Sequence, residues 1–187
     1  MDILLDSLKQ YYITDKNIYQ LLEVIESTNK ISLRIIDWFV TNYSKKNNIY
    51  YTIYRTSDGR RTFEGEGNQP YKQFNTYHSY KSQLKSYSKK RFDPFCRRER
   101  IQFEYDENKH IETTVGQLNF FKWAIDNLII DFIIANYKEI EEDMTNSFQI
   151  IKKHKKISNE RKKRQELSKS ASRGLNQTKY PVILKFD

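Results

Sequence analysis

Apolar residues recur every three or four positions in the first part of the chain. This spacing predicts amphipathic helices over residues 2–12 and 15–27, with Thr14 as the N-cap of the second. A third stretch with the same spacing covers residues 32–46 and places its apolar side chains on one face. The hydrophobic pattern therefore predicts a helical N-terminal part over residues 1–47.

The pattern then changes to one that is typical of strands. Residues 48–55, NIYYTIYR, are rich in β-branched and aromatic side chains and precede a Ser-Asp-Gly turn. A return strand is expected within residues 60–67, followed by a loop. Residues 100–105 and 110–113 alternate apolar and polar side chains on either side of a second turn. One or two β-hairpins are therefore expected.

Three further helices are predicted around and after the second hairpin. Residues 75–90 form a helix that ends before the Asp-Pro pair of FDPF, because a residue that precedes proline avoids the helical region. Thr114 and Gln117 form a capping-box pattern that opens a long helix over residues 115–136, which has the widest apolar face of the chain. Another helix is expected over residues 138–156.

These elements predict an α+β fold with a helical N-terminal part, one or two β-hairpins and a long C-terminal core helix. We expect a single domain over residues 1–149. We expect residues 150–178 to form a basic arm or an exposed helix, because the segment 157–177 has no apolar face to bury. Residues 179–187 end in YPVILKFD, which predicts a C-terminal strand that returns to the domain.

The composition argues against a secreted or membrane-spanning protein. The longest apolar stretch, residues 128–135, is interrupted by Asp131 and is too short to span a bilayer. The N-terminal MDILLDSLKQ is acidic where a secretory signal needs basic residues. The single cysteine, Cys96, cannot form an internal disulfide, which is typical of a reducing compartment. We therefore expect an intracellular protein without a membrane partner.

Charge is distributed unevenly along the chain, whose net charge is +9. Residues 81–100 carry 8 basic and 2 acidic residues, residues 101–149 carry 3 and 10, and residues 150–187 carry 12 and 3. Lysine codons are AT-rich, so genome composition is one source of the excess, but it would spread lysine evenly. The blocks instead predict a polyanion-binding face or self-association between opposite charges.

The first basic block begins on the predicted helix of residues 75–90. The side chains expected to pack inward from this helix are Tyr77, Tyr80, Leu84 and Tyr87. Lys81, Lys85 and Lys89 follow a neighbouring stripe about 12 Å long. A duplex strand carries one phosphate per ~3.4 Å of axis, so this row spans several phosphates. The basic residues that continue across the turn are Lys90, Arg91, Arg97, Arg98 and Arg100.

The second basic block is a less specific signal of phosphate binding, because its basic residues show little regular spacing. It would neutralise phosphates without reading base sequence, and the simpler alternative is a solvated linker. The phosphate contacts predicted here are Lys152, Lys153, Lys155, Lys156, Arg161, Lys162, Lys163 and Arg164.

Catalytic chemistry finds little support in the sequence. The arginines that flank Cys96 would lower its thiol pKa, and His78 or His110 are conceivable partners, but no nucleophile motif surrounds it. We expect Cys96 to be a small half-buried residue beside the FDPF turn. Asp93 with the Glu-Asn-Lys of residues 107–109 faintly resembles a nuclease metal set, but those residues fall in a turn. We predict no catalytic residue, no metal site and no cofactor.

Three stretches carry a family resemblance: SYKSQLKSYSKKRFDPFCRRERI, ETTVGQLNFFKWAIDNLIIDFI and SASRGLNQTKYPVILKFD. Together with SLRIIDWFVTNYSKKNNI, they resemble conserved uncharacterised proteins of nucleocytoplasmic large DNA viruses of the mimivirus and phycodnavirus type. The resemblance covers about residues 32–187. It implies a viral source, in the virion or the host cytoplasm, and assigns no catalytic residue.

The favoured function is that of a non-enzymatic giant-virus protein that binds the phosphate backbone of DNA or RNA, in the virion or the viral factory. The binding elements would be the basic helix–turn–strand and the basic C-terminal arm. The alternative is a structural or assembly protein whose basic blocks meet the acidic residues 139–143 of a second copy or of an acidic viral partner. The third hypothesis is a nuclease that uses Cys96 or a bound metal ion.

Overall fold

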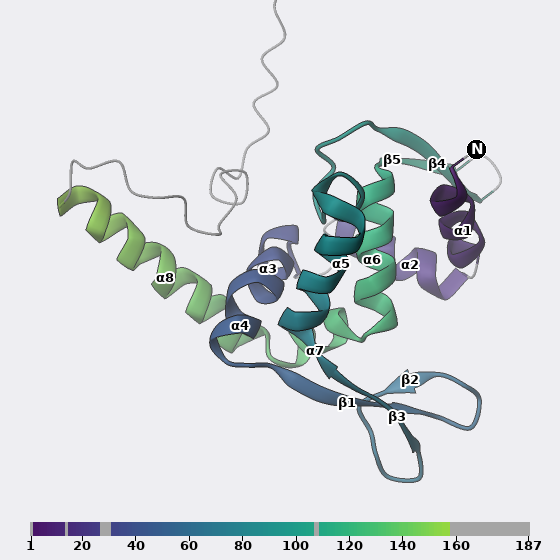
Figure 1. The fold of residues 1–187 in the computed structure, drawn as a ribbon, viewed down its shortest axis with the longest axis horizontal. Helices are drawn as coiled ribbons and strands as arrows, with labels where there is room; N and C mark the ends of the chain where they lie inside the picture. Colours follow the sequence, from purple (N-terminus) through teal and green to yellow (C-terminus); the bar gives the residue numbers. More distant parts are fainter. Residues whose placement is uncertain (1, 14, 27–30, 107–108, 158–187) are drawn as a thin grey trace, which may run out of the picture.

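The computed structural model describes residues 2–13, 15–26, 31–106 and 109–157. It confirms the α+β class. The helices form the body, a three-stranded sheet projects from one side of it, and a two-stranded sheet lies at another edge (Figure 1). The last helix, α8, extends away from the rest of the described chain (Figure 1).

The N-terminal part is helical, as predicted. Its segments are α1 (Ile3–Tyr12), α2 (Asp15–Ile25), α3 (Leu33–Trp38), the π-helical η1 (Phe39–Tyr43) and α4 (Ser44–Lys46). Ser32 caps α3, because its hydroxyl accepts a hydrogen bond from the Ile35 N–H at 3.3 Å. The segments α3, η1 and α4 follow one another directly and match the helix predicted over residues 32–46. Thr14 lies outside the described residues.

The three-stranded antiparallel sheet has the order β2-β1-β3. Its strands are β1 (Tyr50–Arg55), β2 (Arg61–Thr62) and β3 (Gln69–Asn75). The sequence pattern predicted β1 and the return strand but missed β3, where Phe74 alone is buried. Pairing along β1, with Tyr51 opposite Phe74, holds β3 in place.

The long core helix predicted over residues 115–136 is interrupted. It consists of α6 (Val115–Asp126) and α7 (Ile129–Ala135), and Leu128 between them has the left-handed φ of 54°. This part of the fold prediction was wrong, because the apolar periodicity continues across a break in the backbone.

Contacts with the sheet account for the break. Tyr51 donates its hydroxyl to the Asn127 carbonyl at 2.6 Å, and Lys72 donates to the Asn127 side-chain oxygen at 3.0 Å. Arg61 donates to the Asp126 carbonyl at 2.6 Å. The last carbonyls of a helix lack intrahelical partners and carry negative partial charge, so cations of the sheet stabilise this helix end.

The second predicted hairpin is confirmed as β4 (Ile101–Asp106) and β5 (Lys109–Thr113). Its buried apolar residue, Phe103, packs edge-on against Tyr12 of α1 with ring centroids 5.9 Å apart. The remaining helices are α5 (Thr76–Arg91) and α8 (Tyr137–Ile157). Both agree with the helices predicted from the sequence to within one or two residues.

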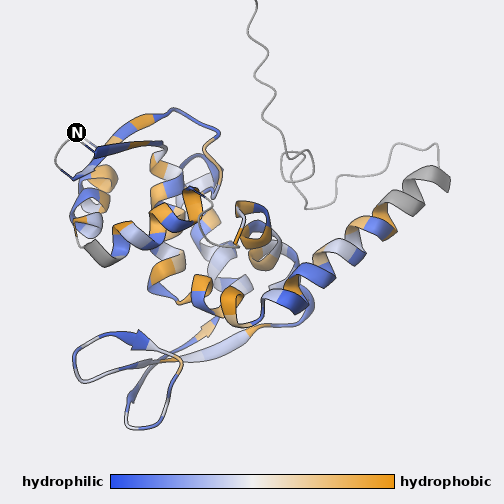
Figure 2. Cartoon of the chain, turned by 180° about the vertical axis from the view of Figure 1, so that it is seen from behind, coloured by the Kyte–Doolittle hydropathy of each residue, from blue (hydrophilic) through white to orange (hydrophobic). Residues whose placement is uncertain are grey.

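One hydrophobic core joins the N-terminal helices, the sheets, α6 and α7. Its largest fully buried rings belong to Tyr12, Phe39, Phe74, Phe92, Phe120 and Phe121. Figure 2 shows the apolar segments turned into the body, and polar residues along the projecting loops of the three-stranded sheet. Most of the predicted arm and the predicted C-terminal strand lie in residues 158–187, outside the described part.

Candidate nucleic-acid interface

Helix α5 carries the first half of the predicted interface and packs against α6. Asn75 caps it by accepting a hydrogen bond from the His78 N–H at 3.0 Å. On the inner face Tyr80 is buried against Trp123, with ring centroids 6.2 Å apart. Ser79 accepts a hydrogen bond from the Trp123 indole at 3.0 Å. These contacts fix which face of α5 meets solvent.

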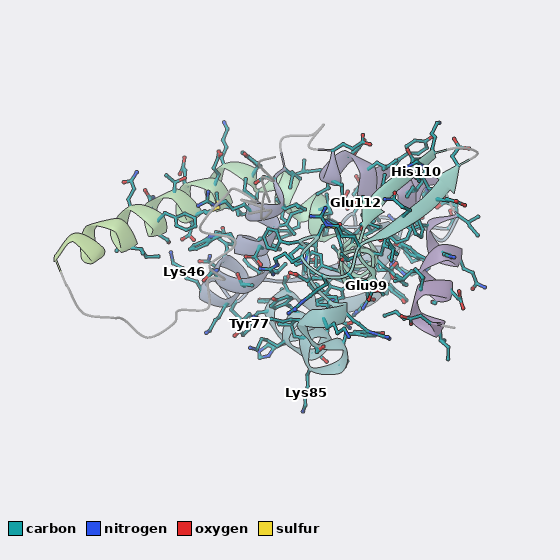
Figure 3. The ribbon with its side chains drawn as sticks, turned by 90° about the horizontal axis from the view of Figure 1, so that it is seen from above. Lys46, Tyr77, Lys85, Glu99, His110 and Glu112 are labelled. Carbon is teal, nitrogen blue, oxygen red and sulfur yellow. The ribbon has the colours of Figure 1, made fainter. Side chains whose placement is uncertain are left out.

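The outer face of α5 presents Lys81 and Lys85, both exposed. Figure 3 shows Lys85 pointing away from the body, with Tyr77 on the same side. Within the described residues neither lysine has a carboxylate within ion-pair distance. Tyr87, predicted to pack inward, is 36% exposed, so this part of the prediction was wrong.

The backbone of α5 breaks at Ser88. Its φ of 58° and ψ of 168° belong to a region that favours glycine, and its hydroxyl accepts a hydrogen bond from the Lys90 N–H at 3.3 Å. The predicted straight row of three lysines is therefore wrong: Lys89 belongs to a separate turn. Lys89 and Lys90 are nevertheless exposed next to the end of the helix.

The FDPF turn fixes the end of α5 on the start of α6. Phe92 is 1% exposed and lies 5.1 Å from Phe120, between ring centroids. Gln117 donates its side-chain amide to the Pro94 carbonyl at 2.9 Å, and the Asp93 N–H donates to the Gly116 carbonyl at 3.2 Å. The structure confirms that the helix ends at this turn, and that Phe92 and Pro94 hold the turn against α6.

Close backbone contact explains the glycine at position 116. A Cβ atom there would lie 3.0 Å from the Lys90 carbonyl oxygen, so a larger residue would push the turn away from α6. The predicted cap of α6 is also present: Thr114 accepts from the Gln117 N–H at 3.1 Å. The Gln117 side chain completes no capping box, because it bonds Thr113 and the Pro94 carbonyl instead.

Three of the predicted phosphate-binding arginines are engaged by carboxylates. Arg97 holds Asp93 through two hydrogen bonds of 2.9 and 2.6 Å. Arg91 pairs with Asp2 at 3.2 Å, and Arg100 pairs with Glu112 across the second hairpin. Asp2 comes from the N-cap of α1, which is remote in sequence from Arg91. Arg98 is exposed and has no such partner in the described part of the chain.

A buried carboxylate lies behind this turn. Asp37 of α3 is 7% exposed, and burial, followed by the charge of Asp93, raises its pKa to about 6. Arg97 and Lys89 oppose that rise. The arginine of the turn thus neutralises acidic groups inside the protein, which makes it less available for an external phosphate.

Cys96 is half-buried, as predicted, but its chemistry differs from the expectation. Burial raises the pKa of its thiol, and this effect outweighs the lowering by Arg100. The lowering expected from the neighbouring arginines is therefore outweighed by burial. Across the residues that the structure describes, no three His, Cys, Asp or Glu side chains are grouped to hold a metal ion.

The structure adds one residue that the sequence reading missed, Lys45 of α4, and changes the role of Tyr77. The Lys45 ammonium lies 5.5 Å from the centroid of the Tyr77 ring, a cation–π arrangement at the start of the lysine stripe. Tyr77, which was expected to pack inward, is half-buried and also contacts this cation. The contribution of α4 required the tertiary structure.

Only the first part of the second basic block lies in the described residues. Lys152, Lys153, Lys155 and Lys156 belong to the last turns of α8. Arg161, Lys162, Lys163 and Arg164 lie outside the described residues. The described chain contains no helix with the length and apolarity that a bilayer span requires.

Comparison with known proteins identifies the family. Residues 1–169 match the model of a family of unknown function, DUF7197. The chain belongs to this family. It is 39% identical over 173 residues to an uncharacterised protein of Acanthamoeba polyphaga mimivirus, in an alignment that covers 89% of this chain and 61% of the relative. This match confirms the resemblance to giant-virus proteins. No solved structure matches the chain.

Proposed function

We propose that this protein is a non-enzymatic nucleic-acid-binding protein that contacts the phosphate backbone through the outer face of α5 and the turn after it. The observation that carries the proposal is a set of exposed cations that have no carboxylate within ion-pair distance in the described chain. We call this set the α5 surface; it comprises Lys81, Lys85, Lys89, Lys90 and Arg98.

The spacing of these cations suits a phosphate backbone. Lys81 and Lys85 lie about 6 Å apart along the helix, which is roughly two phosphates of one strand. Cations that contact phosphates release condensed counterions, so affinity falls steeply as salt rises. Phosphate contacts carry no base sequence, and we therefore expect little sequence preference.

Both ends of the helix beneath the α5 surface are anchored. The Asn75 cap holds one end of α5 and the buried FDPF turn holds the other. Arg91 and Arg100 form exposed ion pairs, which contribute only about 0–1 kcal/mol each, so a phosphate can replace their carboxylates. Arg97, paired with the buried Asp93, is better placed to support the turn than to contact a phosphate.

The similarity to a mimivirus protein is compatible with a viral setting, and within this proposal we place the protein in the virion or in the viral factory of the host cytoplasm. The lysines and arginines of the second basic block would add phosphate contacts without adding sequence preference.

The test is fluorescence anisotropy with labelled single-stranded and duplex oligonucleotides, using nuclease-treated protein. The charge-reversal variant K81E/K85E should weaken binding by about tenfold or more at low salt, because two phosphate contacts become repulsive. The matched control K9E/K138E changes net charge equally, at exposed lysines of α1 and α8. We expect the control to retain most of the affinity.

Two results would contradict the proposal. One is the absence of binding by the wild type at low salt. The other is an equal loss of affinity in both double variants, because general charge, and not the α5 surface, would then determine binding.

A further inference from the structure

The projecting sheet β2-β1-β3 carries an exposed tyrosine at an irregular position of β3. Ile53 of β1 pairs with Lys72. Tyr54, the next residue of β1, pairs with Pro70, which leaves Tyr71 without a partner on β1. An extra, unpaired residue in one strand is a β-bulge, and a bulge turns its side chain in a new direction. Tyr71 is 47% exposed on a sheet that stands out from the body (Figure 1), so another molecule can reach its ring.

Two arginines from the other strands lie close to the Tyr71 ring. The guanidinium carbon of Arg55, on β1, lies 4.2 Å from the ring centroid, and that of Arg61, on β2, lies 5.8 Å from it. A guanidinium within about 6 Å of an aromatic centroid is attracted to the ring. The three strands thus bring one aromatic ring and two planar cations together. We call these three residues the arginine–tyrosine cluster.

Arg55 differs from the other arginines of this sheet in its acidic partners. Arg60 pairs with Asp58, and Arg61 pairs with Asp126. Arg55 is exposed, and no carboxylate of the described residues lies within ion-pair distance of it. A guanidinium stacks through its face and donates hydrogen bonds through its edge. Arg55 can therefore lie on the aromatic ring and bind a phosphate at the same time.

The cations next to the cluster are not all neutralised by carboxylates. Asp126 is shared between Arg61 and Lys122, whose ammonium lies 2.6 Å from it. Lys72 donates to the neutral side-chain oxygen of Asn127 at 3.0 Å, and not to a carboxylate. This junction of the sheet with the end of α6 therefore suits an anionic ligand.

A neighbouring cavity is less suited to that ligand. Arg60 and Arg61 line it, but Asp126 and Asp131 line it as well and would repel a phosphate. We therefore place the ligand at the exposed Tyr71 ring and not in the cavity.

A nucleotide of a single strand combines the two groups that the cluster can recognise. Its base has a π-face that stacks on an aromatic side chain, and its phosphate suits a guanidinium. In a duplex the bases are paired and stacked on one another, so only an unpaired strand offers a free base to a tyrosine. Stacking is tolerant of base identity, which agrees with binding of low sequence preference.

We propose that the arginine–tyrosine cluster binds single-stranded nucleic acid, with one base stacked on Tyr71 and a neighbouring phosphate held by Arg55. This inference rests on the proposed function, because it takes nucleic acid as the ligand, and it adds a second site that selects single strands. Strand β3 leads directly into α5, so the cluster and the α5 surface lie on consecutive elements.

A structural role is the simpler account of the same contacts. The two cation–π contacts would then only hold the bulged strand β3 against its neighbours. That account predicts a less stable sheet when Tyr71 is removed, and no change in affinity that depends on bases. The two accounts therefore differ in how Y71A binds strands with and without bases.

The test is fluorescence anisotropy of the nuclease-treated full chain with three labelled probes: an oligothymidylate, the same strand with abasic sites in place of its bases, and a duplex. Y71A should weaken binding to the oligothymidylate by about fivefold or more, because a base–aromatic stack is lost. Its affinities for the abasic strand and the duplex should stay within about twofold of the wild type, because the phosphate contacts remain. R55A should reduce the steepness of the salt dependence of abasic-strand binding by about 0.7, the contribution of one phosphate of a single strand.

Two control variants separate stacking from the loss of any tyrosine. Y50A removes a tyrosine of the same sheet that is 73% exposed and has no cation of the described residues over its ring. It should bind all three probes like the wild type. Y71F keeps the aromatic ring and should retain the affinity for the oligothymidylate. If circular dichroism shows that Y71A does not fold, Y71L replaces it, because leucine keeps apolar bulk without an aromatic face.

Four results would each overturn the proposal: equal wild-type affinity for the oligothymidylate and the abasic strand, unchanged oligothymidylate binding in Y71A or Y71L, an equal loss in Y71A and Y50A, or an unchanged salt dependence in R55A. Failure of the proposed function appears differently. In that case K81E/K85E would bind like its control K9E/K138E, while Y71A would still weaken oligothymidylate binding.

Discussion

Helices α5 and α8 make an informative pair, because each packs one face onto the same body and turns a polar face to solvent. The charged residues on the outer face of α5 are the lysines Lys81 and Lys85, and the turn after it adds Lys89, Lys90 and Arg98. The sequence of α8 instead changes sign along its length, from the acidic residues 139–143 to the lysines of its last turns. The two helices therefore differ in the order of their charges.

That order has different consequences in the two helices. A surface of one sign is attracted to a polyanion at any point along its length, and its affinity depends on the number of phosphates neutralised. Acidic residues near the start of a helix and basic residues near its end, as in α8, stabilise that single helix through its macrodipole. The comparison teaches that the charge sequence on a helix face carries information that net charge does not.

The largest expected effect is on the free energy of unfolding, and it compares the aromatic residues that anchor the two helices. Phe92, which fixes the end of α5, is fully buried, whereas Phe148 of α8 is half-buried. We expect F92A to lower the free energy of unfolding by about 3–5 kcal/mol, and F148A by only about 1 kcal/mol. Urea unfolding followed by circular dichroism measures both. Equal losses would mean that α8 is as firmly anchored as α5.

The next effect concerns Asp37, which lies behind the basic turn of α5. Its pKa of about 6 exceeds the ordinary 3.8, so the folded state holds a proton that the unfolded state releases. The resulting stabilisation is complete below about pH 4 and is lost as the pH rises through 6. Above that pH the buried charge costs roughly 3 kcal/mol.

The variant D37N removes this charge. We therefore expect it to be more stable than the wild type at pH 7–8, by up to about 3 kcal/mol, and the difference to shrink toward pH 4. Asp93, Arg97 and Lys89 are the charged neighbours that remain. Urea unfolding at several pH values measures the difference, and a difference that does not change with pH would contradict the assignment.

The smallest effect is expected at Cys96. Because burial raises its thiol pKa, Cys96 is protonated at neutral pH and should react slowly with a thiol reagent such as Ellman's. C96S should change the stability by less than about 0.5 kcal/mol and leave nucleic-acid affinity unchanged. A loss of function in a folded C96S protein would instead support an enzymatic role for Cys96.

Local patterns predicted much of this fold. Apolar spacing located the N-terminal helices, α5 and α8, and local chemistry located the Thr114 cap and the stop at FDPF. These features depend on residues within a few positions of one another. The half-buried state of Cys96 followed from the same local reasoning.

Long-range contacts account for what the sequence did not show. The break between α6 and α7 depends on Tyr51, Lys72 and Arg61 of the sheet, which supply hydrogen bonds to the end of α6. Pairing with β1 holds β3, whose own pattern is weak. In the candidate site, the carboxylate of Asp2 reaches Arg91 from the N-cap of α1. No local pattern in the sequence predicts these contacts.

The salt dependence of duplex binding tests the central claim most directly. The logarithm of the binding constant of the wild type should fall linearly with the logarithm of the salt concentration. Removing both lysines of α5 in K81A/K85A should reduce the steepness of this plot by about 1.8, because each lost phosphate contact contributes about 0.9 to its slope. A slope that K81A/K85A leaves unchanged would show that the α5 surface does not contact the phosphate backbone.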